Sequence, residues 1–179
     1  MKLFIQIPCL NEAEFLPATL KALPRKVEGF TEVYWLVIDD GSDDNTAEVA
    51  LANGVDYVVR FSHNQGLASA FQAGVDACLK LGADVIINTD ADNQYDASAI
   101  PALVKPILDG VADVVVGDRD TKNVTEFSWL KRKLQTFGTS VVQNFSGVPV
   151  TDATSGFRAF DREAAMQINL VSKFTYTIE

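Results

Sequence analysis

Short β-rich runs alternate with helical segments along the chain. The runs with the length and composition of strands are residues 3–7, 33–38, 57–61, 84–88 and 114–116. The segments with helical character are residues 11–23, 46–53, 67–81 and a helix that begins near residue 97. This alternation gives at least four β/α repeats. It predicts an α/β fold whose mostly parallel central sheet carries helices on both faces.

The helix expected at residues 67–81 has the clearest buried face. Its apolar and small side chains recur at three- and four-residue steps, at Leu67, Ala70, Phe71, Gly74, Cys78 and Leu81. The first helix is expected to begin at a capping box, in which Asn11 and Glu14 satisfy free backbone N–H groups. A further helix with a basic start is expected at residues 129–145.

The composition is that of one compact domain. Of 179 residues, 47% are apolar and 22% are charged, and the net charge of −9 would repel nucleic acid. The two cysteines lack the spacing of a zinc site and are expected to be buried. No apolar run is long enough to span a bilayer, and no signal peptide is evident, so we expect a cytoplasmic location, either free or at the cytoplasmic face of a membrane. The pattern at residues 174–179 has no terminating signal, and the domain is expected to continue.

Acidic side chains follow the second and fourth expected strands. Asp39 and Asp40 end the second, and Asp90 and Asp92 follow the fourth. Ligands of open α/β sheets bind at this carboxyl edge. Asp90 and Asp92 can leave an extended chain on the same side, and paired carboxylates suit Mg²⁺ or Mn²⁺, to which Gln94 could add a carbonyl oxygen. The alternative is a solvated turn that caps the helix near residue 97.

Other phosphate and metal motifs are missing or weaker. The chain has no GxxxxGK[ST] loop and no GxGxxG fingerprint, and an EF-hand beginning at Asp90 lacks its glycine and glutamate. A carboxylate within residues 39–46 could accept hydrogen bonds from a nucleotide base or ribose. Arg119 could pair with a diphosphate, or be a surface cation beside neighbouring aspartates. His63 is assigned no catalytic role.

Several segments occur in order between residues 8 and 158: Pro8 with Asn11-Glu12, Val37-Ile-Asp-Asp-Gly-Ser-Asp-Asp-Asn-Thr46, Asn64-Gln-Gly-Leu-Ala-Ser-Ala70 with Gly74, Asp90-Ala-Asp-Asn-Gln94, Val116-Gly-Asp-Arg119 and Asp152-Ala-Thr-Ser-Gly-Phe-Arg158. This series resembles the family 2 glycosyltransferases of the GT-A fold. Within them it is most similar to the branch that contains dolichol-phosphate mannosyltransferase and polyprenyl-phosphate glycosyltransferases. Cys9-Leu10 and Ala68 depart from the usual residues of the nucleotide pocket.

The resemblance implies that residues 1–179 form a single GT-A catalytic domain, a Rossmann-like fold that binds a nucleotide-diphospho-sugar. It implies that the nucleotide is bordered by Pro8, Asn11, Glu12, Asp39, Asp40 and Ser42, and that Mg²⁺ or Mn²⁺ is held by Asp90, Asp92 and Gln94. Arg119 and Arg132 would face the phosphates of donor and acceptor, and residues 152–158 would line the acceptor side. The residues expected to act in catalysis are Asp90, Asp92, Arg119, Arg132 and Asp152.

The expected reaction is inverting transfer of a hexose from GDP-mannose or a UDP-sugar to a polyprenyl or dolichyl phosphate. A phosphate acceptor is already anionic and needs no general base, whereas a sugar hydroxyl does. The chain has Thr154-Ser-Gly-Phe157 where transferases to hydroxyls carry an acidic base, and it lacks a QxxRW motif. Two alternatives stay open: transfer to a sugar hydroxyl in cell-envelope glycan synthesis, and non-catalytic binding of a nucleotide-sugar.

Overall fold

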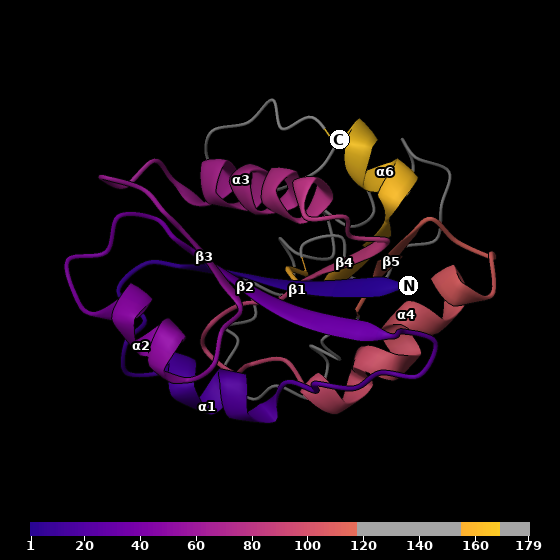
Figure 1. Ribbon diagram of the computed structural model, residues 1–179, viewed down its shortest axis with the longest axis horizontal. Helices are drawn as coiled ribbons and strands as arrows, with labels where there is room; N and C mark the ends of the chain where they lie inside the picture. Colours follow the sequence, from indigo (N-terminus) through magenta and orange to yellow (C-terminus); the bar gives the residue numbers. More distant parts are fainter. Residues whose placement is uncertain (118–154, 169–179) are drawn as a thin grey trace, which may run out of the picture.

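The computed structural model describes residues 1–117 and 155–168. Its centre is a six-stranded sheet in the order β3-β2-β1-β4-β6-β5 (Figure 1). The strands are β1 (Lys2–Cys9), β2 (Glu32–Asp39), β3 (Tyr57–Arg60), β4 (Val85–Asn88), β5 (Val114–Val116) and β6 (Arg158–Asp161). Strands β3, β2, β1 and β4 run parallel, and β6 is antiparallel to both of its neighbours. The mostly parallel α/β sheet predicted from the sequence is confirmed.

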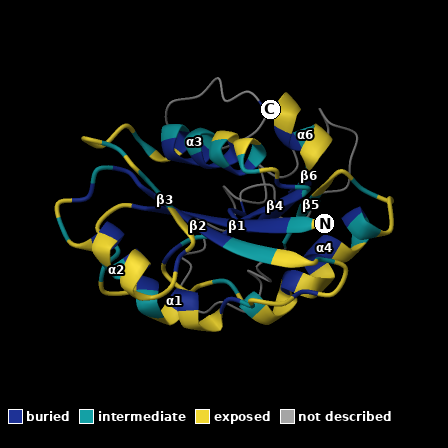
Figure 2. Cartoon of the chain, in the orientation of Figure 1, coloured by how far each residue is buried: buried dark blue, intermediate teal, exposed yellow. Residues whose placement is uncertain are grey.

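Helices cover both faces of the sheet. Figure 1 shows α3 and α6 on one face and α1, α2 and α4 on the other. The helices are α1 (Leu16–Ala22), α2 (Thr46–Ala52), α3 (Leu67–Lys80), α4 (Ile100–Leu108) and α6 (Arg162–Gln167), and the 3-10 turn η1 (Ala97–Ala99) precedes α4. Alternate side chains of β1 therefore enter two separate cores, with Leu3, Ile5 and Ile7 packed toward α1 and α4, and Phe4 toward α3. In Figure 2 most of β1 and the second half of β2 are dark blue, buried between the helices, whereas the start of β2 is intermediate to exposed.

The parallel register brings the ends of three strands to the same level. Cys9 of β1 pairs with Asp39 of β2, and Asp39 pairs with Arg60 of β3. On the other side of β1, Gln6 pairs with Asn88, the last residue of β4. The loops that follow these strands therefore converge at one edge of the sheet, as open α/β sheets require.

The antiparallel strand β6 brings a distant part of the chain to that edge. Arg158, its first residue, pairs with Asn88 and with Val116. Residues 155–158 thus lie beside the end of β4, although they are far from it in the sequence. The Gly117 amide donates to the Phe157 carbonyl oxygen at 2.8 Å, and glycine suits this position because a Cβ atom would lie 2.6 Å from Phe157 Cδ1.

The predicted capping box of the first helix is wrong. Helix α1 begins at Leu16, with Phe15 at its N-cap and no side-chain capping bond, and Pro17 in the first turn favours this start. Asn11 instead adopts a left-handed backbone with φ 56°, and its side-chain oxygen accepts a hydrogen bond from the Asp43 amide. The neighbouring loop therefore takes the side chain that sequence reasoning gave to the helix.

The alternative prediction for residues 90–93 is a turn whose side chains cap the helix near residue 97. The predicted cap is wrong. Asp96 caps the turn at residues 97–99 by accepting from the Ser98 amide at 2.9 Å. In α3 the predicted buried face is confirmed except at Leu67, which is 41% exposed because it borders a cavity, and at the half-buried Leu81. Both cysteines are buried, as predicted.

Two further expectations concern helices. The helix expected at residues 129–145 lies outside the described residues. Within residues 1–117 and 155–168, no helix combines the length and the apolar character needed to cross a membrane.

We predict that Gly74→Ala destabilises the protein, although alanine normally favours a helix over glycine by about 1 kcal/mol. Gly74 packs against the sheet, where a methyl group would overlap Gln6 Oε1 and lie 2.6 Å from Ile38 Cδ1. We expect the free energy of unfolding to fall by about 1–3 kcal/mol in chemical denaturation. The exposed Asp76→Ala on the same helix should change it by less than about 0.5 kcal/mol. A Gly74→Ala protein as stable as the parent would contradict this packing.

Candidate active site

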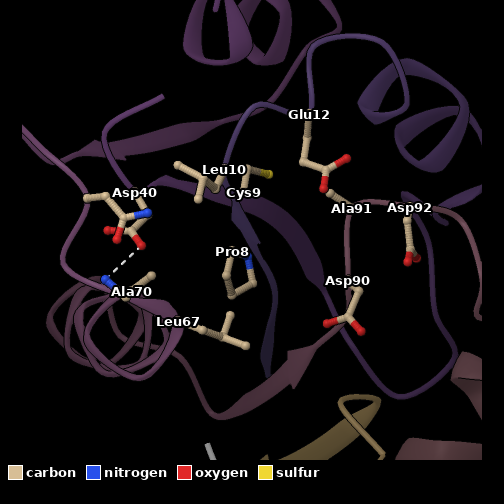
Figure 3. A pocket seen from close by; sticks show the side chains of 12 residues that line it. Pro8, Cys9, Leu10, Glu12, Asp40, Leu67, Ala70, Asp90, Ala91 and Asp92 are labelled. Carbon is tan, nitrogen blue, oxygen red and sulfur yellow. Dashed lines mark hydrogen bonds between the residues drawn. The ribbon is translucent and has the colours of Figure 1, made fainter. Parts of the chain in front are cut away.

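A cavity of about 280 Å³ opens at the carboxyl edge of the sheet. Its floor is formed by the end of β1, and its walls come from the loop after β1, the start of α3 and the loop after β4 (Figure 3). The lining residues are Pro8, Cys9, Leu10, Glu12, Asp40, Asn64, Gly66, Leu67, Ala70, Asp90, Ala91 and Asp92. The cavity therefore combines an apolar side with four carboxylates.

The carboxylates make the cavity strongly acidic. Partial burial and then the charges of Asp92, Asp44 and Asp90 raise the pKa of Glu12 above its ordinary value. Burial, followed by the charge of Glu12, also raises the pKa of the Cys9 thiol, so this residue is a neutral wall rather than a thiolate. Such an accumulation of negative charge favours a cation in the cavity.

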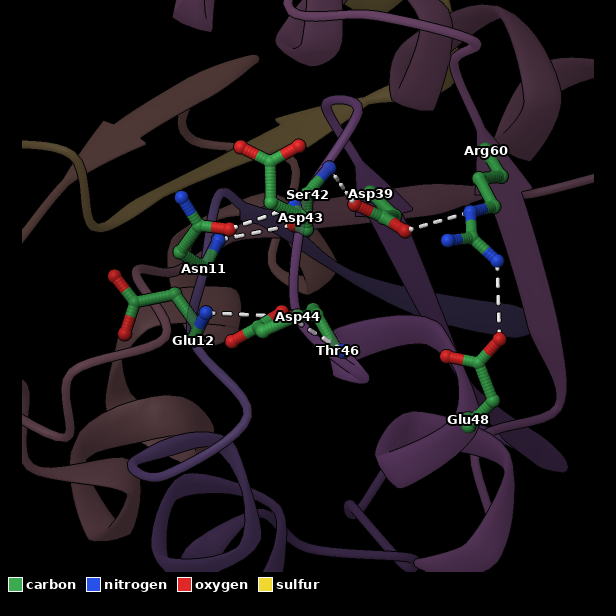
Figure 4. Close-up of polar contacts among 9 residues, drawn as sticks. All are labelled: Asn11, Glu12, Asp39, Ser42, Asp43, Asp44, Thr46, Glu48 and Arg60. Carbon is green, nitrogen blue, oxygen red and sulfur yellow. Dashed lines mark hydrogen bonds and ion pairs between the residues drawn. The ribbon is translucent and has the colours of Figure 1, made fainter.

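Hydrogen bonds connect the loop after β1 to the loop after β2 (Figure 4). The backbone amides of Asn11 and Glu12 donate to the hydroxyls of Ser42 and Thr46, both at 2.9 Å. The Ala13 amide donates to Asp44 at 3.1 Å. Burial alone would raise the pKa of Asp44, but the bonds from Thr46 and Ala13 lower it overall. These contacts fix the backbone that carries Glu12.

Asp40 joins the loop after β2 to the start of α3. Its carboxylate accepts from the amides of Gln65 and Gly66 at 2.7 and 2.9 Å. The dashed line in Figure 3 runs from Asp40 to one of these amides. Gly41 lies so close to the backbone of His63 and Asn64 that a Cβ atom would overlap it. The wall on this side is therefore a rigid backbone contact.

Asp39 is fully buried behind the cavity. One carboxylate oxygen accepts from the Ser42 amide at 2.8 Å, and the other lies 3.2 Å from Arg60 Nε. Arg60 also pairs with Glu48 at 3.0 Å (Figure 4). Arg60, Ser42 and His63 border a second hollow of about 520 Å³. The buried charge of Asp39 is thus compensated by a cation from the neighbouring strand.

The structure gathers some of the sequence-predicted residues and separates others. Pro8, Glu12, Asp40, Asp90 and Asp92 line the cavity together. Asn11, Asp39 and Ser42 do not line it, and they hold the surrounding loops instead. Gln94 lines a different hollow, between α4 and β5, and its backbone amide donates to the Asp92 carboxylate at 3.1 Å. Arg119, Arg132 and Asp152 lie outside the described residues.

The residues present fit a divalent cation only in part. Within the described ranges, no three His, Cys, Asp or Glu side chains converge into a group that could hold a metal by itself. Asp90 and Asp92 nevertheless line one cavity, and the charges of both contribute to the raised pKa of Glu12. Mg²⁺ is commonly held by one or two carboxylates together with water and substrate phosphates. This donor set suits that arrangement rather than an all-protein cage.

Sequence reasoning missed Arg60 and the tyrosine contact at Gly156. Arg60 ends the third strand at the same edge as Asp39, so strand order and charge together could have indicated the pair. The role of Tyr95 leaves no signal in the sequence around it, because its hydroxyl accepts a hydrogen bond from the Gly156 amide, which lies far along the chain.

Comparison with known proteins decides the family. The model of the family described as glycosyl transferase family 2 matches residues 4–168. The chain belongs to this family. The prediction made from the ordered motifs is thereby confirmed, and the family is one of glycosyltransferase enzymes.

Relatives and a solved structure agree with this family and fold. An uncharacterized protein of Methanocaldococcus jannaschii is 36% identical over 93% of this chain and 68% of its own. The undecaprenyl-phosphate mannosyltransferase of Micrococcus luteus is 31% identical over 95% of this chain and 70% of its own. Glucosyl-3-phosphoglycerate synthase of Mycobacterium tuberculosis, crystallised with Mg²⁺ and uridine diphosphate, has a TM-score of 0.68 and 24% identity over 90% of this chain. This chain spans 57% of the length of that synthase. The structural similarity shows that the two proteins share the GT-A fold.

We predict that Asp92→Asn lowers the pKa of Glu12 toward its ordinary value. After burial, the charge of Asp92 is the main cause of the raised pKa, and asparagine removes that charge. The pKa is measured by following the Glu12 carboxyl carbon by NMR through a pH titration. Asp109→Asn, on the exposed end of α4, should leave it unchanged. An unaltered Glu12 pKa in Asp92→Asn would show that the two carboxylates do not share the cavity.

Proposed function

We propose that the chain carries the nucleotide-sugar site of an inverting, metal-dependent glycosyltransferase that moves a hexose from an NDP-sugar to a polyprenyl phosphate. The reaction would take place at the cytoplasmic face of a membrane. The observation that carries the proposal is the cavity at the carboxyl edge of the sheet, with Glu12, Asp90 and Asp92 on its walls. The Micrococcus luteus relative, named for transfer to undecaprenyl phosphate, supports the acceptor class.

The two sides of the cavity suit the two parts of a nucleotide-sugar. Pro8, Leu10 and Leu67 provide apolar surface against which a base or sugar ring can pack. The Glu12 carboxylate can accept hydrogen bonds from ribose or sugar hydroxyls. A diphosphate brought beside Asp90 and Asp92 would be repelled by their charges, and this repulsion is the reason to propose a bound cation.

Asp90 and Asp92 would hold Mg²⁺ or Mn²⁺. Gln94, the further ligand that the family resemblance implies, borders the hollow between α4 and β5 instead. When bound, such an ion stabilises the negative charge that develops on the departing nucleoside diphosphate. The Mycobacterium tuberculosis synthase, which shares the fold, was crystallised with Mg²⁺ and uridine diphosphate. Arg119 is proposed to pair with the same diphosphate through its planar guanidinium group.

The acceptor phosphate needs orientation rather than deprotonation. Its oxygen already carries the negative charge with which it attacks the sugar carbon, and a single displacement with the diphosphate leaving from the opposite side inverts that carbon. Arg132 and Asp152 are proposed to lie on this acceptor side. The role of the described residues is to hold the donor with its sugar carbon facing residues 155–158.

We predict that the protein binds one nucleoside diphosphate in the presence of Mn²⁺ and loses most of this binding in EDTA. The physical reason is that a cation must offset the carboxylates of the cavity before a diphosphate can enter. GDP and UDP are titrated separately by calorimetry, so that the preferred nucleotide also identifies the donor class. Absence of binding by both nucleotides with Mn²⁺ would contradict the proposed donor site.

Variants test the metal part of this prediction. Asp92→Asn should weaken binding of the diphosphate by at least about tenfold, since loss of even an outer-shell partner of a metal costs that much. Binding of the bare nucleoside should change little. Asp76→Asn, on the exposed face of α3, is the matched control. Equal weakening of nucleoside and diphosphate would refute the metal role of Asp92.

We predict that the sugar is transferred to a lipid phosphate. The complete protein is incubated with the NDP-sugar it prefers and with either a polyprenyl phosphate or an oligosaccharide, and the products are separated by mass spectrometry. Product on the lipid phosphate alone supports the proposed acceptor, because that acceptor needs no general base. Product on the oligosaccharide would favour the hydroxyl-transfer alternative, and nucleotide binding without any product would favour a binding domain.

A further inference from the structure

Side chains on both sides of the acidic pair hold the same distant residue. Asn88, which ends β4, donates from Nδ2 to the carbonyl oxygen of Gly156 at 2.8 Å. Tyr95 accepts through its hydroxyl from the amide of Gly156 at 2.9 Å. Both polar backbone groups of Gly156 are therefore paired with side chains of residues 88–95, the segment that also carries Asp90 and Asp92.

Neither of the two holding side chains is loose. Asn88 is fully buried, and its Oδ1 accepts from Gln6 Nε2 at 3.0 Å, which fixes the direction of its amide group. The Tyr95 ring stacks on Phe157 with 5.2 Å between ring centroids and 18° between ring planes. The contacts to Gly156 thus extend from the buried end of β4 to the hollow between α4 and β5, which Tyr95 and Phe157 line.

The held segment is itself rigid and is tied to a third element. Residues 155–158 are buried, and within them Arg158 Nε donates to the Ser155 carbonyl oxygen at 2.7 Å. The Phe157 carbonyl oxygen accepts from the Gly117 amide, just after β5. Movement of Gly156 would therefore disturb contacts to β4 and β5 together.

We propose that Asn88 and Tyr95 are positioning residues that hold residues 155–158 at a fixed place relative to Asp90 and Asp92. This inference rests on the proposed function, in which Asp90 and Asp92 serve the donor and residues 155–158 face the sugar carbon that is transferred. The two substrates are then aligned through the two hydrogen bonds at Gly156, which we call the Gly156 joint. A small misplacement of reacting groups lowers turnover strongly, so a weakened joint impairs transfer more than donor binding.

The test is Tyr95→Phe, which removes the hydroxyl and keeps the ring that stacks on Phe157. We expect kcat of the complete protein to fall by about fivefold, because the hydrogen bond from the Gly156 amide is lost, while the Kd of the nucleoside diphosphate with Mn²⁺ stays within about twofold. Amide hydrogen exchange at Gly156 should become faster than in the parent. Tyr57→Phe, in the aromatic cluster of β3, is the matched control for losing a hydroxyl.

The outcomes separate this inference from the proposed function. Unchanged kcat in Tyr95→Phe, in a protein whose parent binds nucleotide and transfers sugar, would overturn the positioning role and leave the function standing. A parallel loss of nucleotide affinity and kcat would assign Tyr95 to the donor site and also overturn it. A parent protein that binds no nucleotide would overturn the proposed function, and the positioning role with it.

Discussion

Backbone amides at the carboxyl edge of the sheet need hydrogen-bond partners that the strands cannot supply. Strands β1, β2 and β3 end in register, and the loops that follow them meet without a ladder between them. Side chains of one loop therefore accept from the backbone of the next: Asp40 from residues 65 and 66, Asp44 from Ala13, and Ser42 from Asn11. Without these acceptors the cavity would have no fixed walls.

This constraint divides the acidic residues into two kinds. Carboxylates that accept several backbone N–H groups are stabilised in their charged form and serve the architecture, as the lowered pKa of Asp44 shows. Glu12 is different, because its side chain faces the cavity and its pKa is raised. An acidic residue whose charge is disfavoured in the folded protein is a better indicator of a ligand than an acidic motif in the sequence. On this ground Glu12 is the acidic residue of the cavity that best indicates a ligand, and Asp90 and Asp92, which line the same cavity, are proposed to act with it.

Strands β1 to β5 could be predicted from the sequence, because apolar runs are local signals, but β6 was not predicted. Five of the cavity residues were also predicted, from strand ends and from the family resemblance: Pro8, Glu12, Asp40, Asp90 and Asp92. Which acidic residues hold the loops and which face the cavity could not be predicted. Asn11 resembles a helix cap in its own segment, yet its side chain accepts from Asp43, a partner 32 residues away. Asp40 is a cavity residue and a loop anchor at once. Contacts between loops leave no trace in local spacing, so sequence reasoning assigned these side chains to nearer partners.

The switch from parallel to antiparallel pairing at β4 explains how residues 155–158 come to lie beside the end of β4. A parallel neighbour of β4 would bring its own end, and the loop after it, to the carboxyl edge of the sheet. Because β6 is antiparallel, its beginning lies there instead, with Arg158 opposite Asn88. The residues just before β6 are thereby placed beside the loop after β4, where Asn88 and Tyr95 can reach Gly156. One reversed strand thus places residues 155–158 beside the segment that carries the acidic pair.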